Sequence, residues 1–214
     1  MHIVELDKVG STNDELKDLA EKGAPHFTVV VANRQTKGRG RGGRKWESPK
    51  GNLYLSVLFR EKLTPLISYI GAVAVRETIG NCSIKWPNDI LIDGKKAAGL
   101  LLEAVEGQYI MLGIGINIES APSYGAKVNE DIKKVRDILL ARLWHNFKEY
   151  KQQGFAPIRK KWLEHAAFMG EEITVNLPNS IKKGIFLDLT ENGELKLETK
   201  DGTELISSGE IYAE

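Results

Sequence analysis

Residues 36–46, TKGRGRGGRKW, gather positive charge on a glycine-rich stretch of chain. Arginine pairs with carboxylate or phosphate in a planar, bidentate geometry, and glycine lets backbone N–H groups approach a bound group closely. Charge-assisted hydrogen bonds contribute roughly 1.5–3 kcal/mol each, so several together offset the entropy lost when a loop becomes ordered. The stretch is therefore predicted to wrap an anion. A solvated linker or a nonspecific RNA-binding segment remains open from this stretch alone. From Arg34 to Trp46 the chain holds six basic side chains and no acidic one: Arg34, Lys37, Arg39, Arg41, Arg44 and Lys45.

A second stretch with chemistry is KWPNDILIDGKKAAG, residues 85–99. Pro87 favours an extended chain before it, which puts Asp89 at the start of a strand. Asp93 and Gly94 form a hairpin-type turn, so Asp89 and Lys96 are predicted to lie on neighbouring strands. A carboxylate and an ammonium beside a basic loop make a mixed-charge site, and an ion pair exposed on the hairpin is the alternative.

The glycines of GIGIN, residues 113–117, allow a ligand close to a strand, although a bulge or tight packing explains them equally well.

Common nucleotide motifs do not account for the basic loop. The glycines at 38, 40 and 43 spell G-x-G-x-x-G, but a dinucleotide site needs that motif to run directly into a helix. Here it runs into RKWESPKGN, whose proline and glycine oppose a helix. A Walker loop is excluded as well, because no Gly-Lys-Ser/Thr follows at the required spacing.

Composition bounds the class of protein. The chain has 214 residues, 42% hydrophobic and 28% charged, which fits one globular domain or one with a small appendage. A net charge of +1 gives no general attraction for nucleic acid or membranes, so any basic function is local. The lone Cys82 excludes an internal disulfide framework, and the four histidines show no metal-ligand spacing. Without a signal pattern or an apolar run near about 18 residues, a cytoplasmic location is expected.

The surrounding pattern predicts the elements that position these stretches. Thr12 is expected to cap a helix that ends at Gly23, with Glu15 completing a capping box. Further helices are predicted over 65–80, 129–153 and after Pro157. Strands are predicted at 2–6, 27–33, 52–59, 83–86, 89–92, 96–105 and 108–116, with hairpin-type turns at 93–94 and 106–107. After Gly170 the pattern changes to short strands at 171–177, 184–189, 194–199, 203–208 and 210–214. The predicted fold is α+β: a mixed β-sheet with packed helices over 1–169, and a small C-terminal β-barrel over 170–214.

Taken together, these stretches resemble the biotin protein ligases. The motifs that carry the resemblance are VGSTND (9–14), RQTKGRGRGGRKW (34–46), KWPND (85–89), GKKAAG (94–99), GIGIN (113–117) and the terminal SGEI (208–211). Their order and spacing fit that family along essentially the whole chain. Two features depart from it. Gly42 stands where the family often has arginine or an aliphatic residue, so a looser loop is expected, and residues 119–129 match less clearly.

The resemblance implies the biotin/lipoate ligase catalytic fold with an SH3-like barrel, and a two-step reaction. ATP and biotin, with Mg²⁺, form biotinyl-5′-AMP, and biotin then passes to a lysine of a biotin carboxyl carrier domain. The implied catalytic residues are Lys96, Arg41 and Asp89, with Asp89 also the candidate ligand for Mg²⁺ bound with ATP. The implied biotin-binding residues are Ser11, Thr12, Asn13, Gln35, Arg39, Gly40, Arg41 and Lys96. The implied ATP-binding residues are Arg44, Trp46, Lys85, Asn88 and Asn117.

The partner expected from the resemblance is the biotin carboxyl carrier domain of a biotin-dependent carboxylase. No DNA is expected as a partner, because the catalytic pattern starts at Val9 without a winged-helix domain before it, and no membrane is expected. A homodimer is left open. Two alternatives remain: a lipoate- or octanoate-transferring enzyme, which needs a long apolar tunnel, and a nonenzymatic RNA-binding protein, which leaves KWPND and GIGIN unexplained.

Overall fold

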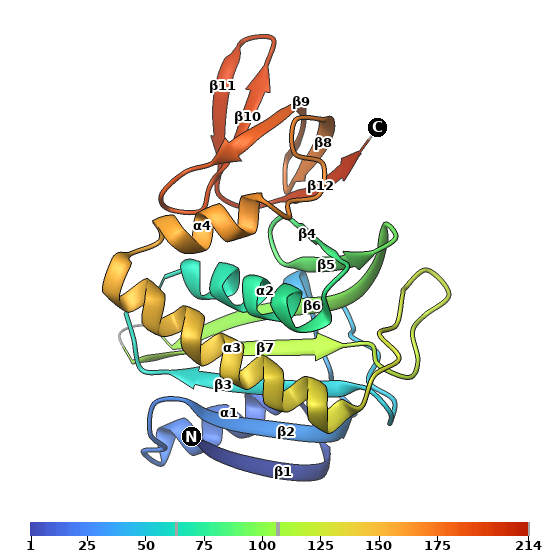
Figure 1. Ribbon diagram of the computed structural model, residues 1–214, viewed down its shortest axis with the longest axis vertical. Helices are drawn as coiled ribbons and strands as arrows, with labels where there is room; N and C mark the ends of the chain where they lie inside the picture. Colours follow the sequence, from blue (N-terminus) through green and yellow to red (C-terminus); the bar gives the residue numbers. More distant parts are fainter. Residues whose placement is uncertain (63, 106–107, 214) are drawn as a thin grey trace.

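The computed structural model describes residues 1–62, 64–105 and 108–213. Its larger part is a seven-stranded sheet in the order β1-β2-β3-β7-β6-β5-β4 (Figure 1). β1 and β2 run parallel, and the other neighbouring pairs run antiparallel, so the predicted mixed sheet is confirmed. The strands are β1 (His2–Val9), β2 (Thr28–Gln35), β3 (Leu53–Phe59), β4 (Ser83–Lys85), β5 (Asp89–Ile92), β6 (Lys95–Val105) and β7 (Tyr109–Ile116).

The inner strand β3 shows how the sheet separates two cores. Successive side chains of a strand point to opposite faces. Leu55 and Val57 belong to the larger core, beneath helices α2 (Leu66–Ile79) and α3 (Ile132–Gln153), and Leu58 belongs to a smaller core with Leu16 of helix α1 (Thr12–Glu21). Figure 1 shows α2 and α3 in front of the sheet and α1 behind it. The face covered by α1 is the one on which the polar residues of the N-terminal motif gather.

The hairpin predicted between β5 and β6 is present. Asp93 and Gly94 have φ values of 49° and 73°, the left-handed conformation that a tight hairpin turn of this kind requires. The ladder then pairs Asp89 with Gly99 and Leu91 with Lys96. The turn predicted at 106–107 lies outside the described residues.

The C-terminal part is a five-stranded antiparallel sheet in the order β11-β10-β9-β8-β12, reached through helix α4 (Ala156–Leu163). Within the described chain β11 and β12 are its two edges and are not paired with each other. Trp162 of α4 packs against Phe186, which joins this sheet to the main core. Its strands are β8 (Glu172–Leu177), β9 (Ser180–Leu189), β10 (Leu195–Thr199), β11 (Gly202–Ile206) and β12 (Glu210–Ala213).

Two predicted helix starts are wrong. Ser11, rather than Thr12, is the residue that precedes α1, and its side chain makes no capping hydrogen bond. The Thr12 hydroxyl instead donates to Gln35, so a tertiary partner outcompetes the local cap. The third helix begins at Ile132 rather than near 129, because the Asp131 side chain accepts from the Lys134 N–H and caps it there.

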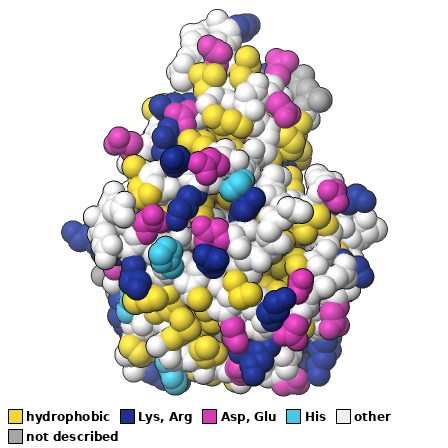
Figure 2. Space-filling model, viewed as in Figure 1, with side chains coloured by type: hydrophobic (Ala, Val, Ile, Leu, Met, Phe, Trp, Pro, Cys, Tyr) yellow, Lys and Arg dark blue, Asp and Glu magenta, His cyan; other side chains and the backbone are white. Residues whose placement is uncertain are grey.

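Figure 2 shows the face that carries α2, α3 and α4. Basic and acidic side chains are interspersed over it rather than gathered by sign. This face therefore offers no single-sign field of the kind that attracts nucleic acid. No helix in the described part of the chain is both long enough and apolar enough to span a membrane.

Candidate active site

A cavity of ≈ 420 Å³ opens between the start of α1, the basic loop, the β5–β6 hairpin and β7. Cations outnumber anions six to two among the described side chains that line it, so it is built to receive negative charge. Its floor is apolar or glycine-rich, with Leu100, Leu101, Gly113, Ile114 and Gly115. Most of the residues implied by the resemblance line it: Ser11, Thr12, Asn13, Gln35, Arg39, Gly40, Arg41, Arg44, Trp46, Lys85, Asn88, Asp89 and Lys96.

The basic loop is folded across this cavity by its own backbone. The N–H groups of Thr36 and Lys37 bond to the carbonyls of Val9 and Gly10 at 3.0 and 2.7 Å, which holds the loop against the start of α1. A single turn of 3-10 helix, Arg41–Gly43, forms the tip, where Gly42 has a φ of 63°. That left-handed conformation is strained for a residue with a side chain, so glycine suits the position.

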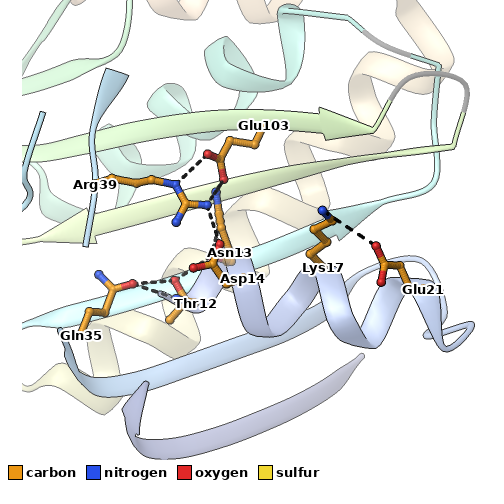
Figure 3. A network of polar contacts seen from close by, with 9 residues as sticks. Thr12, Asn13, Asp14, Lys17, Glu21, Gln35, Arg39 and Glu103 are labelled. Atoms are coloured by element: carbon orange, nitrogen blue, oxygen red, sulfur yellow. Dashed lines mark hydrogen bonds and ion pairs between the residues drawn. The ribbon is translucent and has the colours of Figure 1, made fainter. Parts of the chain in front are cut away.

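A polar network lies where α1 meets β2 and β3 (Figure 3). Gln35 Oε1 accepts from the Thr12 N–H at 2.9 Å and from its hydroxyl at 3.1 Å, while Gln35 Nε2 donates to Ser48. The buried Ser56 hydroxyl reaches both Thr12 and Asn13. The Ser11 hydroxyl, by contrast, makes no hydrogen bond to any described residue. Ser11 is therefore the polar group of this wall that has its hydrogen-bonding capacity free.

The loop arginines have different partners. Arg41 Nη1 donates to Asn88 Oδ1 at 3.3 Å and to the Gly209 carbonyl at 3.2 Å, both neutral oxygens. Arg44 forms an ion pair with Glu210 of β12. Burial opposes ionisation of Glu210, but its hydrogen bond from Tyr212 and the charge of Arg44 bring its pKa below the ordinary value. The C-terminal sheet thus closes one side of the cavity.

Lys96 stands at the mouth of the hairpin. Its Nζ lies 2.6 Å from Asp89 Oδ1 and 5.3 Å from the centre of the Trp46 ring. Gly99 makes room for both, since a Cβ there would lie 3.1 Å from Lys96 Cε and 3.1 Å from Trp46 Cζ3. The Lys96 ammonium is therefore held at a fixed point by a carboxylate on one side and an indole face on the other.

Lys85 and the two asparagines complete the nucleotide side implied by the resemblance. Lys85 Nζ lies 4.6 Å from the centre of the Tyr212 ring, and burial lowers the pKa of its ammonium. Asn88 lines the cavity while its amide donates to the Leu100 carbonyl. Asn117 is not among the lining residues. It is 4% exposed, and its amide donates to the carbonyls of Lys96 and Ala126, so it fastens the following segment to β6.

Known proteins are similar to this one over almost the whole chain. Residues 6–117 match the model of the "Biotin/lipoate A/B protein ligase family", and residues 168–213 match the "Biotin protein ligase C terminal domain". The bifunctional ligase/repressor of Bacillus subtilis is 34% identical over 98% of this chain and 73% of its own length. The biotin–[acetyl-CoA-carboxylase] ligase of Paracoccus denitrificans is 32% identical over 97% of this chain and 98% of its own. The chain belongs to the biotin protein ligase family.

Solved structures of biotin protein ligases have the same fold. The enzyme of Aquifex aeolicus, solved with biotin and ATP, superposes with a TM-score of 0.86 at 32% identity, covering 100% of this chain and 98% of that one. The expected class of enzyme, a biotin–protein ligase, is confirmed by these relatives. Roles of single residues in this biotin protein ligase still rest on their geometry.

Several residues in or near the cavity of this ligase were not predicted from the sequence. Tyr124 and Tyr212 line the cavity mouth and Ser56 lies beneath its wall. Glu103 of β6 binds Arg39 with both of its oxygens. The only signal for the C-terminal contributors was the SGEI motif, and no local signal marks Glu103, because its partner is 64 positions away in sequence.

The described side chains favour neither a metal site made by the protein alone nor a cysteine nucleophile. Within residues 1–62, 64–105 and 108–213, no group of three or more His, Cys, Asp or Glu side chains could hold a metal ion. Asp89, the candidate Mg²⁺ ligand, has its Oδ1 engaged by Lys96. Burial raises the pKa of Cys82 to about 11, so its thiol stays protonated near neutral pH and is a poor nucleophile.

Proposed function

We propose that this protein activates biotin with ATP to biotinyl-5′-AMP and transfers biotin to a lysine of a biotin carboxyl carrier domain. The observation that carries the proposal is the cavity itself, which joins an apolar, glycine-rich floor to a cluster of cations. Biotin has the matching parts: an uncharged ring, an apolar chain and a terminal carboxylate. A lipoate or octanoate enzyme shares the first family model but gives no reason for the match to the biotin ligase C-terminal domain.

The first step forms a bond between a biotin carboxylate oxygen and the α-phosphorus of ATP, and pyrophosphate leaves. Two anions must approach, so cations fixed before the reaction lower its barrier. Arg41 and Lys96 suit this role, because the guanidinium of Arg41 has neutral oxygens as partners and the ammonium of Lys96 is oriented by Asp89. Asp89 is proposed to position Lys96 rather than to remove a proton.

The uncharged end of biotin is proposed to lie at the start of α1. The Ser11 hydroxyl offers the free hydrogen-bonding group there. Thr12 and Gln35 already bond to each other, which fixes the shape of the wall. The chain of biotin then runs along the apolar floor, past Leu100, Leu101 and Ile114. This order puts the carboxylate toward Lys96 and the loop.

The nucleotide is proposed to occupy the side with Arg44, Trp46, Lys85 and Asn88, near Tyr124. Mg²⁺ is proposed to enter with the triphosphate, because it keeps most of its water and binds substrate phosphates with one or two carboxylates. The donor set fits such loose binding: of the two cavity carboxylates, Asp89 is shared with Lys96 and Glu210 with Arg44. When bound, the ion would neutralise phosphate charge. The loop, lying across the cavity, would keep water from the adenylate.

In the second step the carrier lysine amine attacks the acyl carbon and AMP leaves. The biotin carboxyl carrier domain is therefore the proposed partner. The cytoplasmic location and the homodimer stay predictions.

The test is transfer of labelled biotin. The protein is mixed with Mg-ATP, labelled biotin and a biotin carboxyl carrier domain, with and without unlabelled lipoate or octanoate in excess. Label is expected on the carrier, and neither competitor should reduce it. No transfer, or transfer abolished by lipoate or octanoate, would contradict the proposal.

A further inference from the structure

Arg39 differs from the other loop arginines because protein carboxylates already satisfy its guanidinium. Its Nε and Nη2 donate to the two oxygens of Glu103 at 2.8 and 2.7 Å, and Nη2 also donates to Asp14 at 2.8 Å. The Glu103 hydrogen bond, then that of Asp14, raises the pKa of Arg39 further. Figure 3 shows the guanidinium between the two acidic side chains.

Glu103 is itself held from a second direction. The Asn13 amide donates to Glu103 Oε2 at 2.6 Å, and Asn13 is 3% exposed. Asn13 Oδ1 accepts from the Ser56 hydroxyl. Gly113 lies against this amide, since a Cβ there would be 2.9 Å from Asn13 Oδ1. Both polar ends of Asn13 are therefore occupied by protein groups, and Glu103 joins the start of α1, strand β6 and the loop at one point.

An anionic substrate would have to break three charge-assisted hydrogen bonds to reach the Arg39 side chain. Hydrogen bonds between charged groups are stronger than those between neutral groups, and a carboxylate left behind without its partner adds a further cost. At Arg41 the same substrate replaces two longer bonds to neutral oxygens. Arg39 is therefore suited to holding the loop in place, and Arg41 to binding the substrate anion.

We infer that Arg39 and Glu103 form a positioning pair, which fixes the entry of the loop to the Asn13 segment so that Arg41 and Lys96 face the substrate anion. The Arg39 side chain remains on Glu103 throughout the reaction and does not bind biotin. This inference rests on the proposed function and replaces the direct biotin contact expected for Arg39 and Asn13.

The opposite possibility makes a different prediction. If Glu103 were a placeholder that Arg39 leaves for the substrate carboxylate, removing the Glu103 charge would free Arg39 and tighten biotin binding. If the two residues form a lasting pair, removing either one loosens the loop and weakens binding.

The experiment compares Glu103→Gln, Arg39→Gln, their double variant and Glu103→Asp. Glu21→Gln is the matched control, because it removes an α1 surface carboxylate whose lysine partner, Lys17, lies 4.0 Å away. Two quantities are measured: the KM for biotin and kcat of biotin-dependent pyrophosphate exchange, and the rate of trypsin cleavage after Arg41 and Arg44 without substrates. Thermal unfolding shows that each variant is folded.

Each single variant is expected to raise the KM for biotin roughly 10-fold while leaving kcat within about threefold, since the lost bonds position rather than react. The double variant should be no worse than the worse single one. Trypsin should cut the loop faster in both single variants, Glu103→Asp should lie between them and wild type, and Glu21→Gln should match wild type.

A lower or unchanged KM in Glu103→Gln, with a large loss of kcat in Arg39→Gln, would overturn the inference and assign Arg39 to the substrate. Wild-type protein without biotin-dependent exchange would count against the proposed function instead. The trypsin comparison needs no substrate, so equal cleavage of wild type and both single variants would overturn the inference in either case.

Discussion

The Lys96 ammonium and the Asp89 carboxylate lie 2.6 Å apart across the β5–β6 hairpin, at the edge of a cavity whose lining holds six cations. Both side chains are partly shielded, with 34% and 21% of their surfaces exposed. Pairing with Asp89 orients Lys96 at the cost of sharing its charge, so the ammonium is fixed where two substrate anions must meet.

Replacing Lys96 by alanine should abolish most of the activation step. A preorganised charge that acts on a developing anion contributes about 10²–10³-fold in kcat. We expect Lys96→Ala to slow biotin-dependent pyrophosphate exchange by about that factor, and Arg41→Ala to do likewise. Lys50→Ala serves as the control, because Lys50 also pairs with a carboxylate, that of Asp7, but on the open surface. The two side chains are 67% and 70% exposed. Near wild-type exchange in either cavity variant would show that its charge has another role.

Gly115 should tolerate no side chain. A Cβ there would lie 2.6 Å from Trp46 Nε1 and 2.7 Å from Trp46 Cε2, closer than atoms can pack. The indole, which lines the cavity beside Lys96, would have to shift. We expect Gly115→Ala to raise the KM for biotin roughly 10-fold and to lower the free energy of unfolding by about 1–3 kcal/mol, as overpacking does. Gly10→Ala is the control, with its nearest atom 4.0 Å from the added Cβ. Wild-type KM and stability in Gly115→Ala would mean that the indole shifts freely.

Lys85 should give nucleotide binding an alkaline limit. Burial lowers the pKa of its ammonium, although Asp89 opposes the shift, so this lysine loses its proton at a lower pH than an ordinary lysine does. Its attraction for phosphate therefore declines as pH rises through that lowered pKa. We expect the KM for ATP of wild type to rise with pH on the alkaline side, and Lys85→Arg to remove that rise, because a guanidinium stays charged. Parallel profiles for the two proteins would exclude Lys85 as the titrating group.

The hairpin that carries Asp89 and Lys96 could be predicted from sequence because its register is set locally. Asp93 and Gly94 specify the turn, and the two charged residues follow at fixed distances from it. The same holds for the basic loop, because its arginines and glycines predict an anionic ligand whatever the conformation of the loop. Local signals of this kind gave most of the sheet and the cation cluster of the cavity.

Features that depend on distant partners could not be predicted. Thr12 has the right type to cap a helix, but Gln35 is available to it only after β2 has formed beside β1. Glu103 is one polar position in a largely apolar strand, and its role depends on Arg39 and Asn13, which only the folded chain brings to it. The oxygens that Arg41 meets, on Asn88 and Gly209, are likewise distant in sequence from the loop.

The hydroxyl of Tyr69 should stabilise the contact between the two sheets. It donates to the Gly193 carbonyl, in the turn between β9 and β10, and accepts from Trp86 Nε1 at 2.9 Å, both buried contacts. Tyr69→Phe removes both bonds and leaves buried polar groups poorly satisfied, since Trp86 Nε1 is 3.5 Å from the Gly193 oxygen. The expected loss is about 1–3 kcal/mol in the free energy of unfolding, measured by urea denaturation. Tyr150→Phe is the matched control, because Tyr150 is half-buried and its hydroxyl makes no hydrogen bond to a described residue. Trp86 directly precedes Pro87 and Asn88 in the cavity wall, so Tyr69→Phe should also raise the KM for ATP. Equal stability of Tyr69→Phe and Tyr150→Phe would contradict the prediction and show that the Gly193 turn relaxes onto the indole.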